Sequence, residues 1–216
     1  MSKLFRMPSF QALFKVQALS AANDSLLRNA AIMLFAYQNI HFFGLPKTYL
    51  INLSVLLFVL PFFLFSSYAG KLADFGNKIK IVRFIKLCEI LIVITTALVF
   101  YFHNYVWFLL VIFALGTHSA FFGPIKYSIL PQYFTKGEVV LANGYIEMST
   151  FMAIIIGQTV GSWLIASNLI VTLILTSGLF SLLGYFYSFQ LVHVPPTSPR
   201  LKLSKNLLKD AWQMSD

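Results

Sequence analysis

Hydrophobic residues dominate this chain in long runs, which short clusters of polar, glycine and proline residues divide into segments of similar length. Runs such as residues 53–65 and 90–102 do not alternate between apolar and polar positions, as strands of a membrane β-barrel do, so they favour helices. A helix needs about 20 mostly apolar residues to cross a bilayer. Six segments of this kind are predicted as spans, at residues 10–37, 48–69, 81–102, 105–130, 139–166 and 168–192.

The connections between the predicted spans indicate how the helices pair. Residues 41–47 separate the first two spans. The turns at residues 103–104 and 167–168 are so short that the spans on either side must be antiparallel neighbours.

The composition agrees with this pattern. The chain is 58% hydrophobic and 11% charged, with a mean hydropathy of +0.78, whereas soluble domains are about 45–50% apolar and about a quarter charged. The predicted fold class is therefore all-α integral membrane. The single cysteine, Cys88, excludes an intramolecular disulfide, and the sequence shows no nucleophile elbow, acyltransferase-like motif or cluster of metal ligands. We expect no enzymatic activity, no cofactor and no metal.

The net charge of +9 is interpreted as membrane topology, and nucleic acid is not expected as a partner. If the N-terminus is cytoplasmic, thirteen of the sixteen Lys and Arg residues fall on the cytoplasmic side, and Lys47 alone falls on the other. The remaining two lie inside predicted spans. Because basic residues concentrate in cytoplasmic loops, both termini are predicted to be cytoplasmic.

The chain is predicted to have two parts. Residues 1–194 contain the spans, and residues 195–216 begin with a proline-rich stretch that cannot continue a helix. Residues 202–212 are predicted to form a short amphipathic helix on the inner membrane surface, within a cytoplasmic linker.

Charged side chains inside the predicted spans mark a candidate site, because an ion at bilayer depth is costly unless it faces a polar interior. Asp24 and Arg28 lie four residues apart on one face of the first span, where they can pair. They are interpreted either as a self-neutralising structural pair or as the lining of a polar cavity, with Asn23 and Asn29 beside them.

Two further charges lie in the fourth and fifth spans. Lys126 and Glu147 are at comparable depth and can pair if these spans are neighbours. Lys126 lies near the inner end of its span, so its alternative is to extend towards the lipid headgroups. Against this, Gly123 and Pro124 directly precede it, and such a helix break is typical of a span that lines a site.

The polar residues are distributed unequally among the spans. The first, fourth and fifth carry internal charges, whereas the third and sixth are predicted to face lipid, which gives a three-plus-three pattern. Glu89 in the third span is interpreted as a local ion pair with Lys86. Gly157 and Gly161 predict a close helix-packing face. The lone His118 is interpreted as structurally hydrogen-bonded, with a proton relay as the alternative.

Residues 70–78, GKLADFGNK, resemble the loop motif of the major facilitator superfamily. That motif has a glycine, an aspartate four residues later, and then a glycine and basic residues. Here the usual arginine after the aspartate is Phe75, and the second glycine comes one residue early. The resemblance implies that Gly70 packs closely against a helix, and that Asp74 and Lys78 help to hold one conformational state.

Three other segments resemble bacterial lysophospholipid transporters of that superfamily. Residues 20–27 read SAANDSLL, residues 122–131 read FGPIKYSILP and residues 141–150 read LANGYIEMST. The resemblance covers about residues 10–194 and implies transfer of lysophospholipids to the cytoplasmic leaflet of the bacterial inner membrane. It also implies that Asp24, Lys126 and Glu147 line the cavity. Two further residues complete the predicted site. Asn143 belongs to the last of these segments, and Arg28 is included only because of its depth in the first span.

Membership of that superfamily implies twelve spans in two halves, so the six spans here predict an N-terminal half that needs a second six-helix half as a partner. The expected partners are thus a lysophospholipid, membrane lipid and that second half, and we expect no transport by the isolated six helices. Two alternatives remain open: a proton-coupled drug or metabolite exporter, and a membrane interaction subunit without transport. Lipid uptake that is independent of a proton ionophore favours the lysophospholipid transporter over the exporter.

Overall fold

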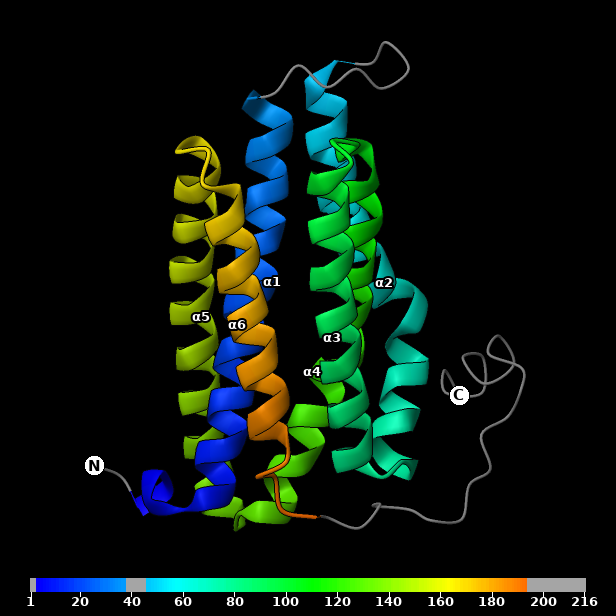
Figure 1. Cartoon of the computed structure of the whole chain (residues 1–216). Helices are drawn as coiled ribbons and strands as arrows, with labels where there is room; N and C mark the ends of the chain where they lie inside the picture. The colour runs from blue at the N-terminus through cyan, green and yellow to red at the C-terminus, as the bar shows by residue number, and fades with distance from the viewer. Residues whose placement is uncertain (1–2, 38–45, 194–216) are drawn as a thin grey trace.

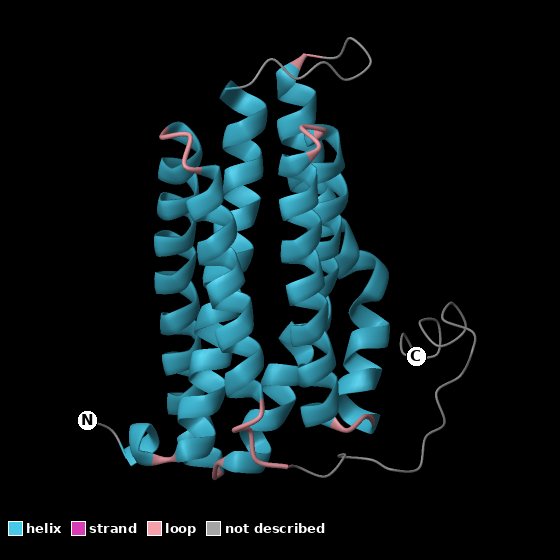
Figure 2. Cartoon of the chain, viewed as in Figure 1, coloured by secondary structure: helices cyan, strands magenta, loops and turns pink. Residues whose placement is uncertain are grey.

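The computed structural model describes residues 3–37 and 46–193, and all regular structure in these ranges is helical (Figure 2). Six long α-helices are accompanied by two short 3-10 helices. The elements are η1 (Lys3–Arg6), α1 (Pro8–Tyr37), α2 (Lys47–Phe75), α3 (Lys78–Tyr101), η2 (Tyr105–Trp107), α4 (Phe108–Tyr133), α5 (Lys136–Ala166) and α6 (Ile170–Ser188). The predicted linker and its amphipathic helix lie outside the described residues.

Five segments of the described chain are long and apolar enough to cross a membrane: α2, α3, η2 together with α4, α5 and α6. These confirm five of the predicted spans by length and composition. The remaining helix, α1, has 30 residues and would be about 45 Å long at 1.5 Å per residue. It is too polar to qualify by composition, because its middle carries Asp24, Arg28 and several amide and hydroxyl side chains.

α1 is the central helix of the bundle. It contacts α2, α4, α5 and α6, while α3 packs against α4 and α6 and α2 packs against α4. In Figure 1 the long helices run side by side. The described chain starts at η1 and ends just after α6, and both of these ends lie at the same end of the bundle. The most polar helix is therefore enclosed by its neighbours.

Local sequence signals explain where the helices begin and turn. α5 begins with a capping box in which Thr135 and Glu138 satisfy each other's backbone N–H groups. Asn77 caps the start of α3, and its side chain accepts a hydrogen bond from the Lys80 N–H. The two tight turns contain His103 and Asn168 in the left-handed region, with φ of 51° and 57°. These turns make α3–α4 and α5–α6 the antiparallel hairpins that the sequence predicts (Figure 1).

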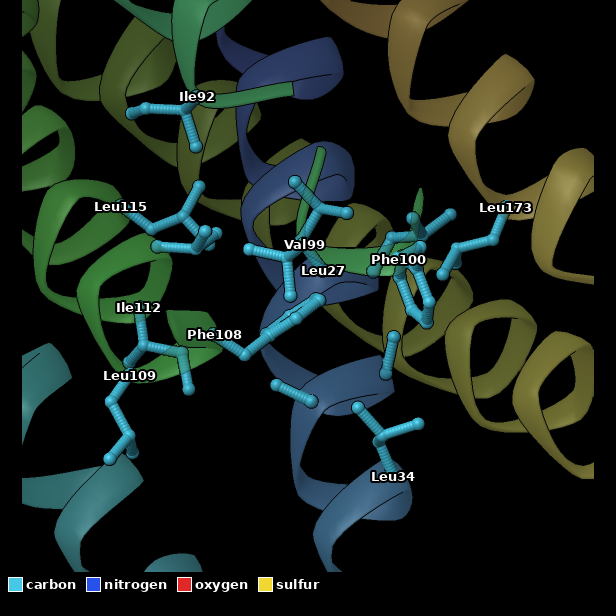
Figure 3. Packing of buried hydrophobic residues seen from close by; sticks show 14 of the residues in the cluster. Leu27, Leu34, Ile92, Val99, Phe100, Phe108, Leu109, Ile112, Leu115 and Leu173 are labelled. Atoms are coloured by element: carbon cyan, nitrogen blue, oxygen red, sulfur yellow. The ribbon is translucent and has the colours of Figure 1, made fainter. Parts of the chain in front are cut away.

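Two apolar clusters are separated by a buried polar layer. One cluster lies at the end of the bundle that holds the described termini and includes Phe10, Ile79 and Ile129. The other lies towards the opposite end and packs Leu27 of α1 against α3, α4 and α6 (Figure 3). Between them are buried polar side chains from five helices: Gln17, Ser20, Asn23, Asp24, Ser25, Lys86, Glu89, His118, Lys126, Ser149, Ser177 and Ser181.

The prediction that the third and sixth spans face lipid is wrong for one face of each helix. Lys86 and Glu89 of α3 are fully buried and face α1. α6 also contributes buried serines, among them Ser177, whose hydroxyl donates to Asn23. The cause is that α3 lies against both α4 and α6, so one face of α3 belongs to the interior.

The backbones of α1 and α5 approach each other closely. A Cβ atom added at Gly157 would overlap the carbonyl oxygen of Ala22, and one added at Gly161 would overlap that of Leu26. The predicted packing role of these two glycines is therefore confirmed. Close backbone approach of this kind increases van der Waals contact, which is a main source of helix association in lipid.

Gly157→Ala and Gly161→Ala are each expected to lower the free energy of unfolding by roughly 1–3 kcal/mol, because overpacking forces the two backbones apart. Gly178→Ala in α6 is the matched control, since an added Cβ there meets nothing within 4 Å. Thermal unfolding in detergent measures the difference. Equal stability of all three variants would contradict the α1–α5 packing.

Candidate functional site

A polar cavity lies between α1, α2, α4 and α5 at the level of the buried polar layer. Its volume is about 330 Å³, and its wall combines charged, hydroxyl and aromatic side chains. A wall of this kind suits a ligand that has a polar end and an apolar end. The wall includes Gln17, Ser20, Asp24, Ser25, Arg28, Phe58, Phe62, Ser119, Phe122, Lys126, Tyr127, Thr150 and Ile154.

Asp24 lies on the cavity wall about halfway along α1. Its Oδ2 accepts a hydrogen bond from the Ser119 hydroxyl of α4. Its Oδ1 has no hydrogen-bond partner and lies 3.6 Å from Nδ1 of His118. Both carboxylate oxygens therefore face side chains of α4, while the Asp24 residue borders the cavity.

Arg28 also lines the cavity but does not form the predicted pair with Asp24. Among the ion pairs of the described residues, Asp24 pairs with His118, and Arg28 appears in none. The Arg28 guanidinium carbon instead lies 4.6 Å from the centroid of the Phe58 ring of α2, a cation–π contact. This leaves the Arg28 side chain half-buried at the cavity wall.

Lys126 and Glu147 join α4 to α5. Lys126 Nζ lies 3.8 Å from Glu147 Oε1, and the Tyr127 hydroxyl donates to the same oxygen. Lys126 is 7% exposed, so it stays within the bundle and does not extend to the headgroups. The predicted pair is confirmed, because spans four and five are neighbours at this depth.

Asn143 lies on α5, one turn before Glu147, and is not on the cavity wall. Its Oδ1 is buried and has no hydrogen-bond partner. The structure therefore does not bring Asn143 together with the other predicted site residues, and its role in binding stays a prediction.

The residues of the predicted conformational motif flank the turn between α2 and α3. Asp74 is exposed near the end of α2, while Lys78 is buried at the start of α3 and interacts electrostatically with Asp74. A Cβ added at Gly70 would meet nothing within 4 Å among the described residues. The predicted close packing at Gly70 is therefore not found among these helices.

A second group of buried charges lies behind the cavity wall and was not predicted as part of the site. Lys86 Nζ lies 2.7 Å from Glu89 Oε2 and also donates to the Ser20 hydroxyl. The amide of Asn23 donates to Glu89 Oε1 at 2.8 Å. His118 Nε2 lies 3.4 Å from Glu89 Oε2. Because His118 also faces Asp24, this cluster connects α1, α3 and α4.

The sequence contains a signal for this cluster. Lys86 and Glu89 occur in a row with Val82, Ile85 and Ile92 at spacings of three and four, and all are buried. Such spacing places them on one helix face. The row was missed because the outward face of α3 is equally apolar, so hydrophobicity does not distinguish the interior face from the lipid face.

A separate apolar groove lies between α2, α3 and α4. It has a volume of about 570 Å³, and its lining is aliphatic and aromatic apart from a few groups such as Cys88, Thr117 and the edge of His118. Cys88 is a free thiol. In the part of the chain that the structure describes, no group of three His, Cys, Asp or Glu side chains is placed to hold a metal ion.

Comparison with known proteins gives one family and a set of relatives. The model of the Major Facilitator Superfamily matches residues 13–214. The chain is 29% identical over 163 residues to the lysophospholipid transporter LplT of Escherichia fergusonii, and 30% identical over 158 residues to that of Citrobacter koseri. It is 28% identical over 164 residues to that of Escherichia coli O1:K1 / APEC. No solved structure matches the chain.

These alignments cover most of this chain but a minor part of each relative. For the relatives from Escherichia fergusonii, Citrobacter koseri and Escherichia coli, the alignments cover 76%, 73% and 76% of this chain. They cover 38%, 37% and 38% of the relatives' own lengths. The chain thus spans about two fifths of the length of the curated relatives it matches.

Lys86→Met is expected to lower the free energy of unfolding by roughly 3–5 kcal/mol, because it leaves the buried Glu89 carboxylate without its cation. The double variant Lys86→Met/Glu89→Gln removes both charges and should regain more than half of that loss. Lys80→Met is the matched control, because Lys80 is exposed on the same helix. Chemical unfolding in detergent distinguishes these variants, and a Lys86→Met protein as stable as the control would refute the buried pair.

Proposed function

Because this chain belongs to the major facilitator superfamily, we propose that it moves lysophospholipids across the bacterial inner membrane, towards the cytoplasmic leaflet. The observation that carries the proposal is the polar cavity, in which two cations and a carboxylate share a wall with aromatic side chains. The similarity to lysophospholipid transporters over about three quarters of the chain supports the same substrate class.

The cavity chemistry fits the two ends of a lysophospholipid head group. The phosphate needs cationic donors, which Arg28 and Lys126 supply from α1 and α4. An ammonium or glycerol group needs an acceptor, for which Asp24 on the cavity wall is suited, and Glu147 lies off the wall beside Lys126. Glu147 already holds Lys126, so a phosphate that recruits Lys126 exchanges one anionic partner for another.

The single acyl chain of such a lipid needs an apolar surface beside these charges. Phe58 and Phe62 of α2 and Ile154 of α5 border the same cavity, and Phe62 is 40% exposed. We propose that the acyl chain lies against this side, which would place the head group at α1 and α4. A single site that binds both the head group and the acyl chain accommodates the amphipathic substrate without exposing its phosphate to lipid.

We further propose that α1 is a sixth span and that the chain is the N-terminal half of a twelve-helix carrier with internal three-plus-three repeats. α1 runs beside the other long helices and is enclosed by four of them, so its polar residues need not meet lipid (Figure 1). The coverage of 38% of the relative from Escherichia fergusonii supports a second half. That half would close the open side of the cavity.

The proposed orientation places both termini in the cytoplasm, since thirteen of sixteen basic residues then lie on the cytoplasmic side. The turn with Gly70, Asp74 and Lys78 lies at the end of the bundle that would face the cytoplasm. We propose that the open face at Gly70 receives a helix of the second half in one conformational state, which would restore the close packing expected of the motif.

Arg28→Ala and Lys126→Ala, each made in the complete gene product, are expected to reduce lysophosphatidylethanolamine uptake about tenfold or more. Loss of one charge-assisted hydrogen bond to phosphate is worth about 1.5–3 kcal/mol. Lys126→Arg should retain part of the activity because it keeps the charge. The measurement is uptake of labelled lipid into proteoliposomes.

Lys136→Ala is the matched control, because Lys136 is exposed at the start of α5 and lies outside the cavity. Uptake by the control should equal that of the unmodified protein. Normal uptake by either cavity variant would defeat the phosphate assignment of that residue, and normal uptake by both would defeat the proposed binding mode.

A further inference from the structure

We propose that His118 is a proton-binding site that exchanges its proton for a cationic group bound in the polar cavity. The imidazole ring lies between Asp24 of α1 and Glu89 of α3, and Asp24 borders the cavity. The cation of this exchange is the ammonium of a lysophospholipid head group, so the exchange rests on the proposed function. The proton site itself stands on the geometry of three side chains.

Both ring nitrogens of His118 face carboxylate oxygens. Nδ1 lies 3.6 Å from Asp24 Oδ1, and Nε2 lies 3.4 Å from Glu89 Oε2, and both are electrostatic contacts because neither nitrogen makes a hydrogen bond. A neutral imidazole has one N–H group and one lone pair. In the neutral form the ring would therefore turn a lone pair towards one carboxylate, which is repulsive. The imidazolium form presents an N–H group to each carboxylate, and is the form that fits both contacts.

The charges in the cluster also require the second ring proton. Lys86 and Glu89 are both fully buried and compensate each other at 2.7 Å. Asp24 then remains, and among the described residues the one ion pair it forms is with His118. A neutral ring would leave one buried negative charge in excess, whereas a protonated ring makes the cluster neutral. Excess charge in a low-dielectric interior is strongly unfavourable.

The other titratable groups near the ring do not replace that proton. Tyr68 of α2 and Cys88 of α3 line the apolar groove behind His118, and both are neutral in their usual forms. Arg28 lies one turn beyond Asp24 and interacts with it electrostatically, but its guanidinium stacks on the Phe58 ring and forms no close ion pair with Asp24 among the described residues. Phe122 stacks on the imidazole, with 6.2 Å between ring centroids. The proton route of this proposal runs from the cavity to Asp24 and on to His118.

Asp24 is the point at which proton and ligand compete. It is 9% exposed and lines the cavity, while Glu89 and Lys86 are completely covered. An ammonium group beside Asp24 compensates the same charge that the His118 proton compensates. The proton on Nδ1 then passes to Asp24 and leaves to water in the cavity. By linkage, the proton weakens ammonium binding by the same factor, and couplings of this kind are typically about 5- to 150-fold.

The proton site is tested by nitrogen-15 NMR of the complete gene product, labelled at histidine and reconstituted in lipid, with His118→Gln assigning the signal. We expect both ring nitrogens of His118 to be protonated at neutral pH in the ligand-free protein. Asp24→Asn should lower the proton affinity about tenfold or more, since it removes the nearby opposite charge. His193→Gln, at an exposed histidine, should leave the His118 signal unchanged.

A single protonated nitrogen on His118 in the unmodified protein would overturn the proton site. An unchanged proton affinity in Asp24→Asn would overturn the role of Asp24. Both outcomes are decided without any ligand, so they do not depend on the proposed function.

The exchange is tested by adding lysophosphatidylethanolamine, which carries an ammonium, or lysophosphatidylglycerol, which does not. We expect the first to displace the His118 proton and the second to leave it in place, with binding of each followed by calorimetry. Binding of both lipids without a difference at His118 would overturn the exchange. Absence of binding by either would count against the proposed function, while the ligand-free experiment would still decide the proton site.

Discussion

Compensation of buried charge is the constraint on which the rest of this structure depends. Glu89 and Lys86 have no solvent-exposed surface, and Asp24 and His118 have little. In a low-dielectric interior each must be held by opposite charge or by hydrogen bonds. Side chains of α1, α4 and α6 add hydrogen bonds to this cluster, through Asn23, Ser20, Ser119 and Ser177. The relative positions of the helices are therefore specified more tightly than lipid-like side chains alone would specify them.

The same constraint explains why the polar layer lies between two apolar clusters. In lipid, apolar packing alone does not favour helix association over contact with acyl chains. The clusters instead rely on close contact, as where Gly157 and Gly161 meet the backbone of α1. With the helices held in this way, the cavity side chains keep fixed positions. Asp24 belongs to both the buried cluster and the cavity wall, so it is the residue through which the two act on each other.

Much of this architecture can be predicted from the sequence. The lengths of the apolar segments and the turns at His103 and Asn168 predict the helices and hairpins. The cavity positions of Asp24 and Lys126 follow from their depth and surroundings. The partners are harder to predict, because several residues on neighbouring helices compete for each charge. Arg28 contacts Phe58 although Asp24 is one turn away on the same helix.

The predictions that the structure does not bear out have a common physical origin. The Lys86–Glu89 pair was correctly predicted, but its burial depends on α3 lying against α4 and α6, which no local pattern in an apolar helix reveals. Asn143 was included because residues 141–150 resemble a segment of lysophospholipid transporters, yet it lies off the cavity wall. Gly70 has open space around it among the described residues, so the predicted close packing is not made within these helices.

Substrate protection of an introduced cysteine tests the central claim most directly. Ile154→Cys places a thiol on the cavity wall, and Asn104→Cys places one on the exposed turn before η2, both in a Cys88→Ser background of the complete gene product. Lysophosphatidylethanolamine should slow labelling of Ile154→Cys by a water-soluble maleimide and leave Asn104→Cys unaffected. Equal labelling rates with and without the lipid at Ile154→Cys would contradict a lysophospholipid site in this cavity.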